Sequence, residues 1–536
     1  MNKYIKIFFF LFIAGSLLSC DLDRFPAADI AREESLLTIQ DARNWENGIM
    51  IGLRQRQNGV FAVKQEVQAD LVNATHAFGN RMGDPHRWND FESSNQDLGE
   101  VWYGYFEALS NINNLINEAP GLDALIYANP NHRPAAVIAS ERAELARIVG
   151  VARLARAFYK HELALRWASA YNPATSATAL GIPLVTAFDL TAMPARATLR
   201  ETYEFILADI AAARAALAEV APPTTGVPVR FNRDVVEALE ARVRLYMQDW
   251  TGAITAANRV IATGRYPLVN TAEGMMQMWR YDTSSEIIMQ AFTSSVELPR
   301  LRLRRAIAAG ATTLSIMSNL QFLGFQSATN TFQPDFLPTQ GVVDLFDADD
   351  IRRGVYFDNT RYFNLRGDSI SGIYLISKFR GNPNIAGSAT NADQAPLIFR
   401  AAEMHLIVAE ASFEAGNAAN ALAALNTLRT ARGLTALTGI SGDVLRDEIR
   451  DERTRELAFE GRRLFDLRRW NLPMTRKAPQ VRMVNGEPNL DHLSSGAGFY
   501  NLSIPAGNHR FIWGIPANDM MMNPNLYQNP GWEDDE

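Results

Sequence analysis

The fold of this chain is decided by a stretch of sequence that occurs twice. Residues 238–261 read ALEARVRLYMQDWTGAITAANRVI, and residues 402–429 read AEMHLIVAEASFEAGNAANALAALNTLR. In each copy, apolar residues recur at steps of three and four on both sides of a short turn, which predicts a helix, a turn and a second helix. The copies align at a constant offset of 168 residues, which pairs Ala241 with Ala409, Leu245 with Phe413, Asp249 with Asn417, Ala253 with Ala421 and Ala257 with Leu425.

Alanines at the facing positions let the two helices of each hairpin approach closely, as in tetratricopeptide repeats. Helical periodicity also dominates the rest of the chain, and strand-like runs are few and short. The helical stretches are residues 101–118, 141–168, 198–219, 232–264, 398–432 and 442–470. We therefore predict a mainly α fold in which tetratricopeptide-like hairpins form a right-handed scaffold.

Two regions between the helices differ in composition. They are rich in Gly, Asn, Asp and Pro with interspersed aromatics, and long loops inside a compact protein are usually functional. We predict a single domain, residues 20–536, with a loop-rich ligand-binding subregion. Its parts are a tether (20–36), a helical scaffold (37–69, 99–269 and 398–470), the loop-rich regions (70–98 and 270–397) and a C-terminal segment (471–536).

The N-terminus reads MNKYIKIFFFLFIAGSLLSC. Lys3 and Lys6 precede an uncharged, mostly apolar stretch that is shorter than the ~20 residues of a transmembrane helix, so residues 1–19 predict a secretory signal peptide. Leu17 to Cys20 resemble the bacterial lipobox, in which the cysteine sulfur is acylated. We predict that Cys20 is a lipid anchor to a membrane; the alternative is an incidental cysteine near an ordinary cleavage site.

Composition excludes several function classes. Cys20 is the only cysteine among 536 residues, so the chain has no intrachain disulfide and no cysteine-ligated metal cage. The formal net charge is −7, which does not favour nucleic acid as a partner.

Metal motifs are incomplete. His161 and Glu162 begin like a zincin helix, but position 165 is leucine, so the second histidine ligand is missing. The acidic cluster at Asp344, Asp347, Asp349 and Asp350 lacks the spacing and the glycine of an EF-hand, which leaves calcium open but unsupported. We predict no metal and no cofactor.

The densest charge is in LRDEIRDERTRELAFEGRRLFDLRRW, residues 445–470. On a helix, Glu452 and Glu456 share the face of the apolar residues, and a glycosidase also needs two carboxylates, roughly 5–10 Å apart. One helix turn leaves no cleft for a sugar ring between them. We therefore favour a structural role, in which both glutamates are partly buried and paired with arginines of the same segment, namely Arg453, Arg455, Arg462 or Arg463.

A candidate ligand site lies in FGNRMGDPHRWNDF, residues 78–91. A sugar presents polarised C–H faces and hydroxyl edges, so an aromatic ring beside planar hydrogen-bonding groups suits it. Trp88 is the ring, and the flanking polar residues are Asn80, Arg81, Asp84, His86 and Asn89. The alternative is that Trp88 fastens its loop onto the helices.

A second aromatic cluster precedes the strand-like run EIIMQ, residues 286–290. Trp279 and Tyr281 flank Arg280 there and are candidate ligand residues; the alternative, which we favour, is that Trp279 belongs to the core. Trp102 and Tyr105 lie on a strongly helical pattern and are predicted to be core residues.

Several segments resemble one known family. ERTRELAFEGRRLFDLRRWN (452–471), together with the second hairpin before it and IPANDMMMNPNLYQNPGW (515–532) after it, resembles the SusD/RagB family of surface lipoproteins from Bacteroidetes-type bacteria. Residues 181–185, 196–213 and 344–353 agree with this resemblance, in the expected order along the mature chain.

The resemblance implies a non-catalytic protein of the outer membrane surface. Such proteins rest on a SusC-like TonB-dependent β-barrel transporter, capture a nutrient glycan and pass it to the pore; their helices typically face the transporter and their loops hold the ligand. The alternatives are a peptide-binding capture protein of the RagB type, a scaffold that binds only proteins and, less favoured, a glycoside hydrolase acting through Glu452 and Glu456.

Overall fold

A computed structural model describes residues 35–76, 83–89, 92–94, 96–128, 134–187, 189, 191–297, 334–365, 368–385 and 394–533. The predicted signal peptide, Cys20, nearly all of the tether, Asn80 and Arg81 lie outside the described residues. Within them helices dominate and every sheet has two strands, so the prediction of a mainly α fold is confirmed. None of the helices in this part of the chain combines the length and apolar composition needed to cross a membrane.

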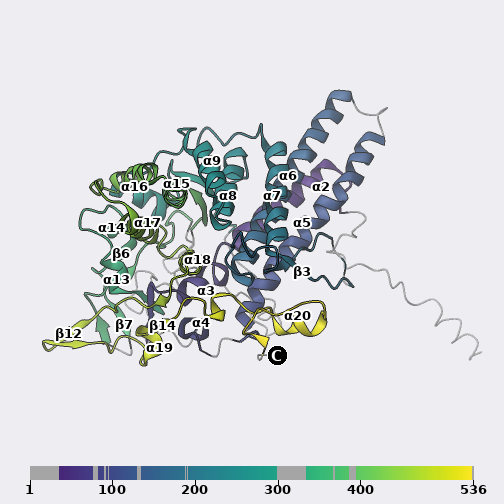
Figure 1. Cartoon of the computed structure of the whole chain (residues 1–536). Coiled ribbons are helices and arrows are strands. Elements are labelled where there is room, and N and C mark those ends of the chain that lie inside the picture. Colours follow the sequence, from purple (N-terminus) through teal and green to yellow (C-terminus); the bar gives the residue numbers. More distant parts are fainter. Residues whose placement is uncertain are drawn as a thin grey trace, which may run out of the picture.

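Antiparallel helices form the scaffold, and Figure 1 shows them side by side from α5 and α6 at one end to α15 and α16 at the other. The first predicted hairpin contacts the second directly, because α9 lies against α15. The scaffold helices are α2 (Ile39–Gln55), α5 (Gln96–Ala128), α6 (Ala135–Trp167), α7 (Leu199–Leu217), α8 (Arg233–Tyr246), α9 (Trp250–Ile261), α15 (Ala401–Glu414) and α16 (Ala418–Ala431).

The repeated hairpins turn at the positions that their sequences indicate. Asp249 caps α9 and Asn417 caps α16: each side chain accepts a hydrogen bond from the backbone N–H three residues on, at 3.0 and 3.1 Å. Four residues after each cap, Ala253 and Ala421 are fully buried. The sequence repeat is therefore a repeat of both capping and close helix packing.

The other helices of the described residues lie outside this set, and all of them except α17 have ten residues or fewer. They are α3 (Val60–Gln68), α4 (Gly83–Arg87), α10 (Ala272–Tyr281), α13 (Gln340–Val343), α14 (Arg353–Tyr356), α17 (Gly442–Glu456), α18 (Arg463–Arg469), α19 (Ala497–Tyr500), α20 (Ala517–Met522) and the 3₁₀ helix η2 (His509–Phe511). The segment 442–470, which periodicity predicted as one helical stretch, is divided between α17 and α18. Phe459 and Gly461 between them have positive φ, and a Cβ on Gly461 would lie 2.7 Å from the carbonyl oxygen of Ala62 in α3.

Antiparallel pairs of short strands join distant segments, and the strand-like run at 286–290 is confirmed as β4. The pairs are β1 (Val72–Ala74) with β5 (Phe336–Pro338), β2 (Leu180–Pro183) with β3 (Arg196–Thr198), β4 (Ile287–Gln290) with β10 (Leu397–Arg400), β6 (Phe357–Asp358) with β9 (Leu375–Ile376), β7 (Phe363–Leu365) with β8 (Asp368–Ile370), β11 (Met474–Thr475) with β14 (Ser503–Ile504) and β12 (Arg482–Val484) with β13 (Glu487–Asn489). In β1–β5, Val72 lies opposite Pro338.

Two large hydrophobic cores lie side by side. The first fills the helical scaffold, where Trp102 and Tyr105 of α5 are buried as predicted. The second is formed by residues of α3, β1, α10, β5, β6 and β9 together with the turn after α17. Much of this second core comes from regions 70–98 and 270–397, so the described parts of the regions predicted to be loop-rich have a packed interior.

Candidate functional site

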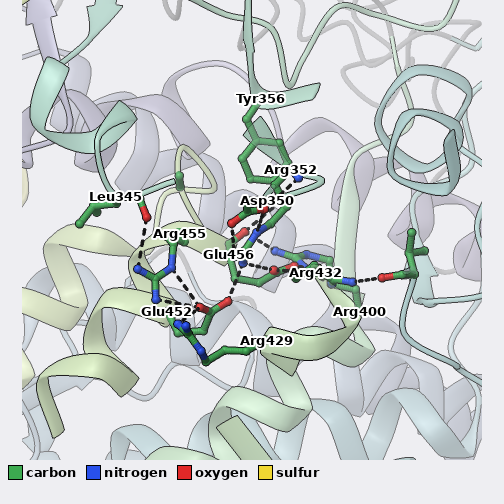
Figure 2. A network of polar contacts seen from close by, with 12 residues as sticks. Leu345, Asp350, Arg352, Tyr356, Arg400, Arg429, Arg432, Glu452, Arg455 and Glu456 are labelled. Atoms are coloured by element: carbon green, nitrogen blue, oxygen red, sulfur yellow. Dashed lines mark hydrogen bonds and ion pairs between the residues drawn. The ribbon is translucent and has the colours of Figure 1, made fainter. Parts of the chain in front are cut away.

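Glu456, the last residue of α17, lies at the centre of a buried ion-pair network (Figure 2). Its carboxylate accepts hydrogen bonds from Arg352 at 2.7 Å, from Arg432 at 2.9 and 3.0 Å, and from Arg400. All four side chains are at most 1% exposed. Burial opposes ionisation, but the three guanidinium charges outweigh it and hold the pKa of Glu456 well below its ordinary value.

Glu452, one turn earlier, is held in the same way. It accepts hydrogen bonds from Arg352 at 2.7 Å and from Arg455 at 3.0 Å. Burial is again outweighed, here by Arg352 and Arg455, so the pKa of Glu452 is also lowered. A glycosidase needs one carboxyl that stays protonated as general acid. The arginine partners instead favour the ionised form of both glutamates, so the geometry does not support the glycoside hydrolase alternative on this pair.

The predicted structural role of the two glutamates is confirmed, but most of the predicted partners were wrong. Only Arg455 of the four bonds to either of them. Arg453, Arg462 and Arg463 instead pair with Asp466, Glu162 and Asp70, at 2.8, 2.9 and 2.8 Å. The other partners, Arg352, Arg400 and Arg432, come from outside α17, so the spacing of residues along this helix could not predict them.

Trp88 of the first predicted ligand cluster points into the protein. It is 4% exposed, its indole N–H donates to the carbonyl oxygen of Gln68 at 2.8 Å, and its ring contacts Phe511 edge to face with centroids 4.8 Å apart. A ring buried in this way offers no face for a sugar to stack on. The geometry is that of the alternative, in which Trp88 fastens its segment to the rest of the fold.

Of the polar residues predicted around Trp88, the structure describes Asp84, His86 and Asn89, and their environments differ. His86 is completely buried against Arg476, and its Nδ1 donates to the carbonyl oxygen of Val67 at 2.8 Å. Burial first, and then the charge of Arg476, lower the pKa of His86 well below the ordinary value. Asp84 is half-buried and pairs with Arg87 at 2.9 Å, whereas Asn89 is exposed. The prediction that Trp88 and His86 contact a ligand at the surface is therefore corrected.

Trp279 of the second cluster is also buried. It is 3% exposed, packs edge to face on Tyr356 and Phe379, and has the Lys378 ammonium 4.3 Å from its ring centroid. The alternative that placed Trp279 in the core is the one that the structure shows. Tyr281, in contrast, is half-buried at the end of α10.

A groove of about 550 Å³ runs along α10, and we call it the α10 groove. Its lining falls entirely within region 270–397 and includes Glu273, Met276, Arg280, Asp349 and Arg380. A cleft of this size is in the range of small-ligand sites, ~300–1,000 Å³. Guanidinium and carboxylate groups supply planar donors and acceptors for hydroxyls, and the exposed Met276 supplies an apolar contact.

The walls of the α10 groove are fixed by hydrogen bonds. Arg280 donates to the carbonyl oxygens of Arg380 and Gly381, at 3.1 and 3.2 Å, and Arg380 pairs with Asp358. Asp350, which also lines the groove, bonds Arg352 of the ion-pair network at 2.7 Å. The groove and the buried ion-pair network are thus linked through the hydrogen bond between Arg352 and Asp350.

Sequence reasoning missed a second groove, of about 520 Å³, between α2 and α5. Trp45, Gly48 and Asn111 line it, and Tyr159 of α6 lies among its lining residues. The available signal was the small residue three positions after Trp45 on one helix face, since glycine there leaves the face open. Trp45 is half-buried, and its indole N–H donates to the carbonyl oxygen of Ser35 at 3.0 Å.

The described residues contain no cluster of three or more His, Cys, Asp or Glu side chains that could hold a metal ion. Stacked helical hairpins form one part of the fold, and the second hydrophobic core with the α10 groove forms another, which we call the groove-bearing half. Arginines occupy the carboxylates of Glu452 and Glu456. Together these features define the class of a binding protein. Residues 347–532 match a family model described as "SusD family", and residues 47–245 match one described as "Starch-binding associating with outer membrane". The chain belongs to the SusD/RagB family, whose members are non-catalytic binding proteins.

Solved structures agree on the fold. A SusD superfamily protein from Bacteroides thetaiotaomicron is 22% identical, with a TM-score of 0.69 over 92% of this chain and 100% of that one. A putative sugar binding protein from Bacteroides vulgatus is also 22% identical, with a TM-score of 0.69 over 93% and 99%. Another SusD superfamily protein from Bacteroides vulgatus is 20% identical, with a TM-score of 0.70 over 92% and 99%. No curated protein sequence matches the chain.

Proposed function

We propose that this chain is a cell-surface lipoprotein that binds a nutrient glycan and delivers it to a SusC-like TonB-dependent transporter in the outer membrane. The observation that carries the proposal is the match of residues 47–245 to the model described as "Starch-binding associating with outer membrane". Two proteins of similar structure, described as a putative sugar binding protein and as a SusD-like carbohydrate binding protein, support it.

The lipid anchor is proposed at Cys20, after cleavage of residues 1–19. Two or more acyl chains hold a protein stably on a bilayer, whereas one chain binds marginally. Cys20→Ser should therefore move the protein from the membrane fraction to the soluble fraction of lysed cells. A serine variant that stays in the outer membrane without the transporter would contradict the anchor.

The α10 groove is the proposed glycan site, with Arg280 and Asp349 as hydrogen-bonding groups. Tyr281, the last residue of α10, follows Arg280 but is not among the lining residues. Trp279 also lines the groove, but it is only 3% exposed and so offers no ring face for a ligand to stack on. The paired guanidinium groups of Arg280 and Arg380 equally suit a carboxylate, because arginine binds carboxylates in a bidentate manner. This keeps acidic sugars and the peptide ligands of RagB-type proteins as the second candidate class.

A glycan array on the lipid-free domain identifies the ligand, and titration calorimetry then measures its affinity. Arg280→Ala should weaken binding by about 1.5–3 kcal/mol, the typical contribution of a hydrogen bond to a charged group. Arg361→Ala is the control, because Arg361 pairs with the groove-wall partner Asp358, at 3.4 Å, but does not line the groove. Equal affinity for both variants would contradict this placement of the site.

The same samples separate the other functions. The bound glycan should keep its length over hours, whereas released shorter products would indicate hydrolysis. Binding of peptides and no glycan would favour the RagB-type function. Co-purification with a large β-barrel, with no ligand in either screen, would favour a scaffold that binds only proteins.

A further inference from the structure

A cavity of about 70 Å³ lies where the two hydrophobic cores meet. One wall comes from the helical scaffold, through residues of α3, α6 and α8. The opposite wall comes from α10, β10 and the turn between α17 and α18. The space is several times the roughly 10–15 Å³ that one water molecule needs, and it is far too small for a sugar ring with its contacts.

The cavity lining is rich in guanidinium groups. It contains Arg56, Arg166, Arg242, Arg400 and Arg462 and three carboxylates, Glu162, Glu403 and Glu460. Two of the arginines also have carboxylate partners outside the lining, since Arg56 pairs with Glu107 and Arg400 with Glu456. Glu162 is shared, since it accepts from Arg166 at 2.7 Å and from Arg462 at 2.9 Å. Two arginines thus face one carboxylate on this wall, which leaves a positive charge in excess.

Among the lining atoms that lack a hydrogen-bond partner within the described residues, donors outnumber acceptors. Four nitrogen atoms have no hydrogen-bond partner among the described residues, namely Asn58 Nδ2, Arg166 Nε, Arg242 Nη1 and Trp279 Nε1. Their residues are at most 7% exposed. The one acceptor without such a partner is Gln65 Oε1. Buried donors are almost always satisfied in folded proteins, so a group that accepts several hydrogen bonds suits this space.

We propose that this cavity binds one small anion, of the size of a halide ion or acetate, between the scaffold and the groove-bearing half. An anion accepts from the four nitrogens and offsets the excess positive charge. A cation meets the guanidinium groups, and a water molecule brings two further donors to a lining already rich in donors. Since both walls contribute, bound anion should stabilise the packing of the two halves against each other.

Bromide tests the proposal, because it scatters anomalously and is close to chloride in size. Crystals of the lipid-free domain soaked in 100 mM-scale sodium bromide, roughly the ionic strength of cells, should show one anomalous peak in the cavity. In solution, bromide should raise the unfolding temperature above that in sodium gluconate of equal ionic strength, because gluconate is too large to enter. Ordered waters in place of the peak, or equal unfolding temperatures in both salts, overturns the proposal.

Trp279→Phe removes one donor and retains an aromatic ring, so it should raise the bromide concentration for half-maximal stabilisation about threefold to tenfold. Trp45→Phe is the matched control, because that indole lines the α2–α5 groove and not the cavity. If Trp279→Phe does not fold, Asn58→Ala tests another of the four donors by the same measurement. Unchanged bromide dependence in the folded variants overturns the assignment of these donors.

Discussion

Glu456→Gln is the sharpest test of what the ion-pair network does. The substitution keeps the size of the side chain and removes its charge, while Arg352, Arg400 and Arg432 stay buried around it. The amide also directs an N–H₂ group at guanidinium N–H groups. Removing one partner of a buried pair typically costs ~3–5 kcal/mol, because the remaining charges lose their compensation. We expect Glu456→Gln to lower the free energy of unfolding by about that amount.

Urea unfolding followed by tryptophan fluorescence measures the effect, as a lower midpoint with an unchanged slope. Asp443→Asn is the matched control on the same helix: its side chain is 84% exposed and pairs with Arg446 at 2.7 Å. Exposed pairs of this kind contribute about 0–1 kcal/mol, so the midpoint of the control should stay near that of the wild type.

The pH dependence has a defined sign. The pKa of Glu456 in the folded protein lies below its ordinary value of 4.5. The stabilisation is therefore fully present above pH 4.5 and is lost as the pH falls toward the folded-state pKa. The difference between wild type and Glu456→Gln should shrink in that acidic range. A glutamine variant with the wild-type midpoint at pH 7 would refute the reasoning, as would a deficit that does not change with acidification.

Three further predictions concern residues outside the ion-pair network. Trp88→Ala should lower the free energy of unfolding by ~3–5 kcal/mol, by opening a cavity beside Phe511, and should leave the glycan affinity of the folded protein unchanged; a tenfold weaker affinity at an unchanged urea midpoint would return Trp88 to the ligand site. Asn417→Ala should cost ~1 kcal/mol through loss of the helix cap to Asn420, and Asn417→Asp should not; equal urea midpoints for all three proteins would contradict the capping role. Burial lowers the pKa of Lys160 to about 7 from 10.5, so wild-type stability should rise as the pH increases between these values. Lys160→Met should therefore be more stable than wild type at pH 6, with the advantage shrinking toward pH 10, and an advantage independent of pH would contradict this.

Helical periodicity predicted most of the scaffold because it is a local property. The stretch 141–168 is the core of α6, which spans Ala135–Trp167, and 198–219 matches α7, Leu199–Leu217. The break between α17 and α18 was not predicted. It depends on the close approach of Gly461 to the carbonyl oxygen of Ala62, some 400 residues earlier in the chain, and no local pattern records that contact.

The candidate site was less predictable for the same physical reason. A segment with a tryptophan among Asn, Arg and Asp has the same composition whether the ring faces a ligand or packs inward. Trp88 packs inward because of its contacts with Gln68 and Phe511, which both lie outside its segment of the sequence. Periodicity indicated correctly that Glu452 and Glu456 share the buried face. It could not indicate arginines that are 24, 56 and 104 residues away from Glu456.

The three arginines come from separate segments, and each lies at the end of a helix. Arg400 is the N-cap of α15, Arg432 is the C-cap of α16 and Arg352 is the N-cap of α14. Glu456 therefore joins the ends of the second repeated hairpin to the segment that carries Asp350, a wall of the α10 groove. A groove held from behind in this way needs little rearrangement to bind, which lowers the entropic cost of capturing a ligand. The charge density that resembles a catalytic pair in the sequence thus has its physical use in fixing the wall of the proposed binding groove on the scaffold.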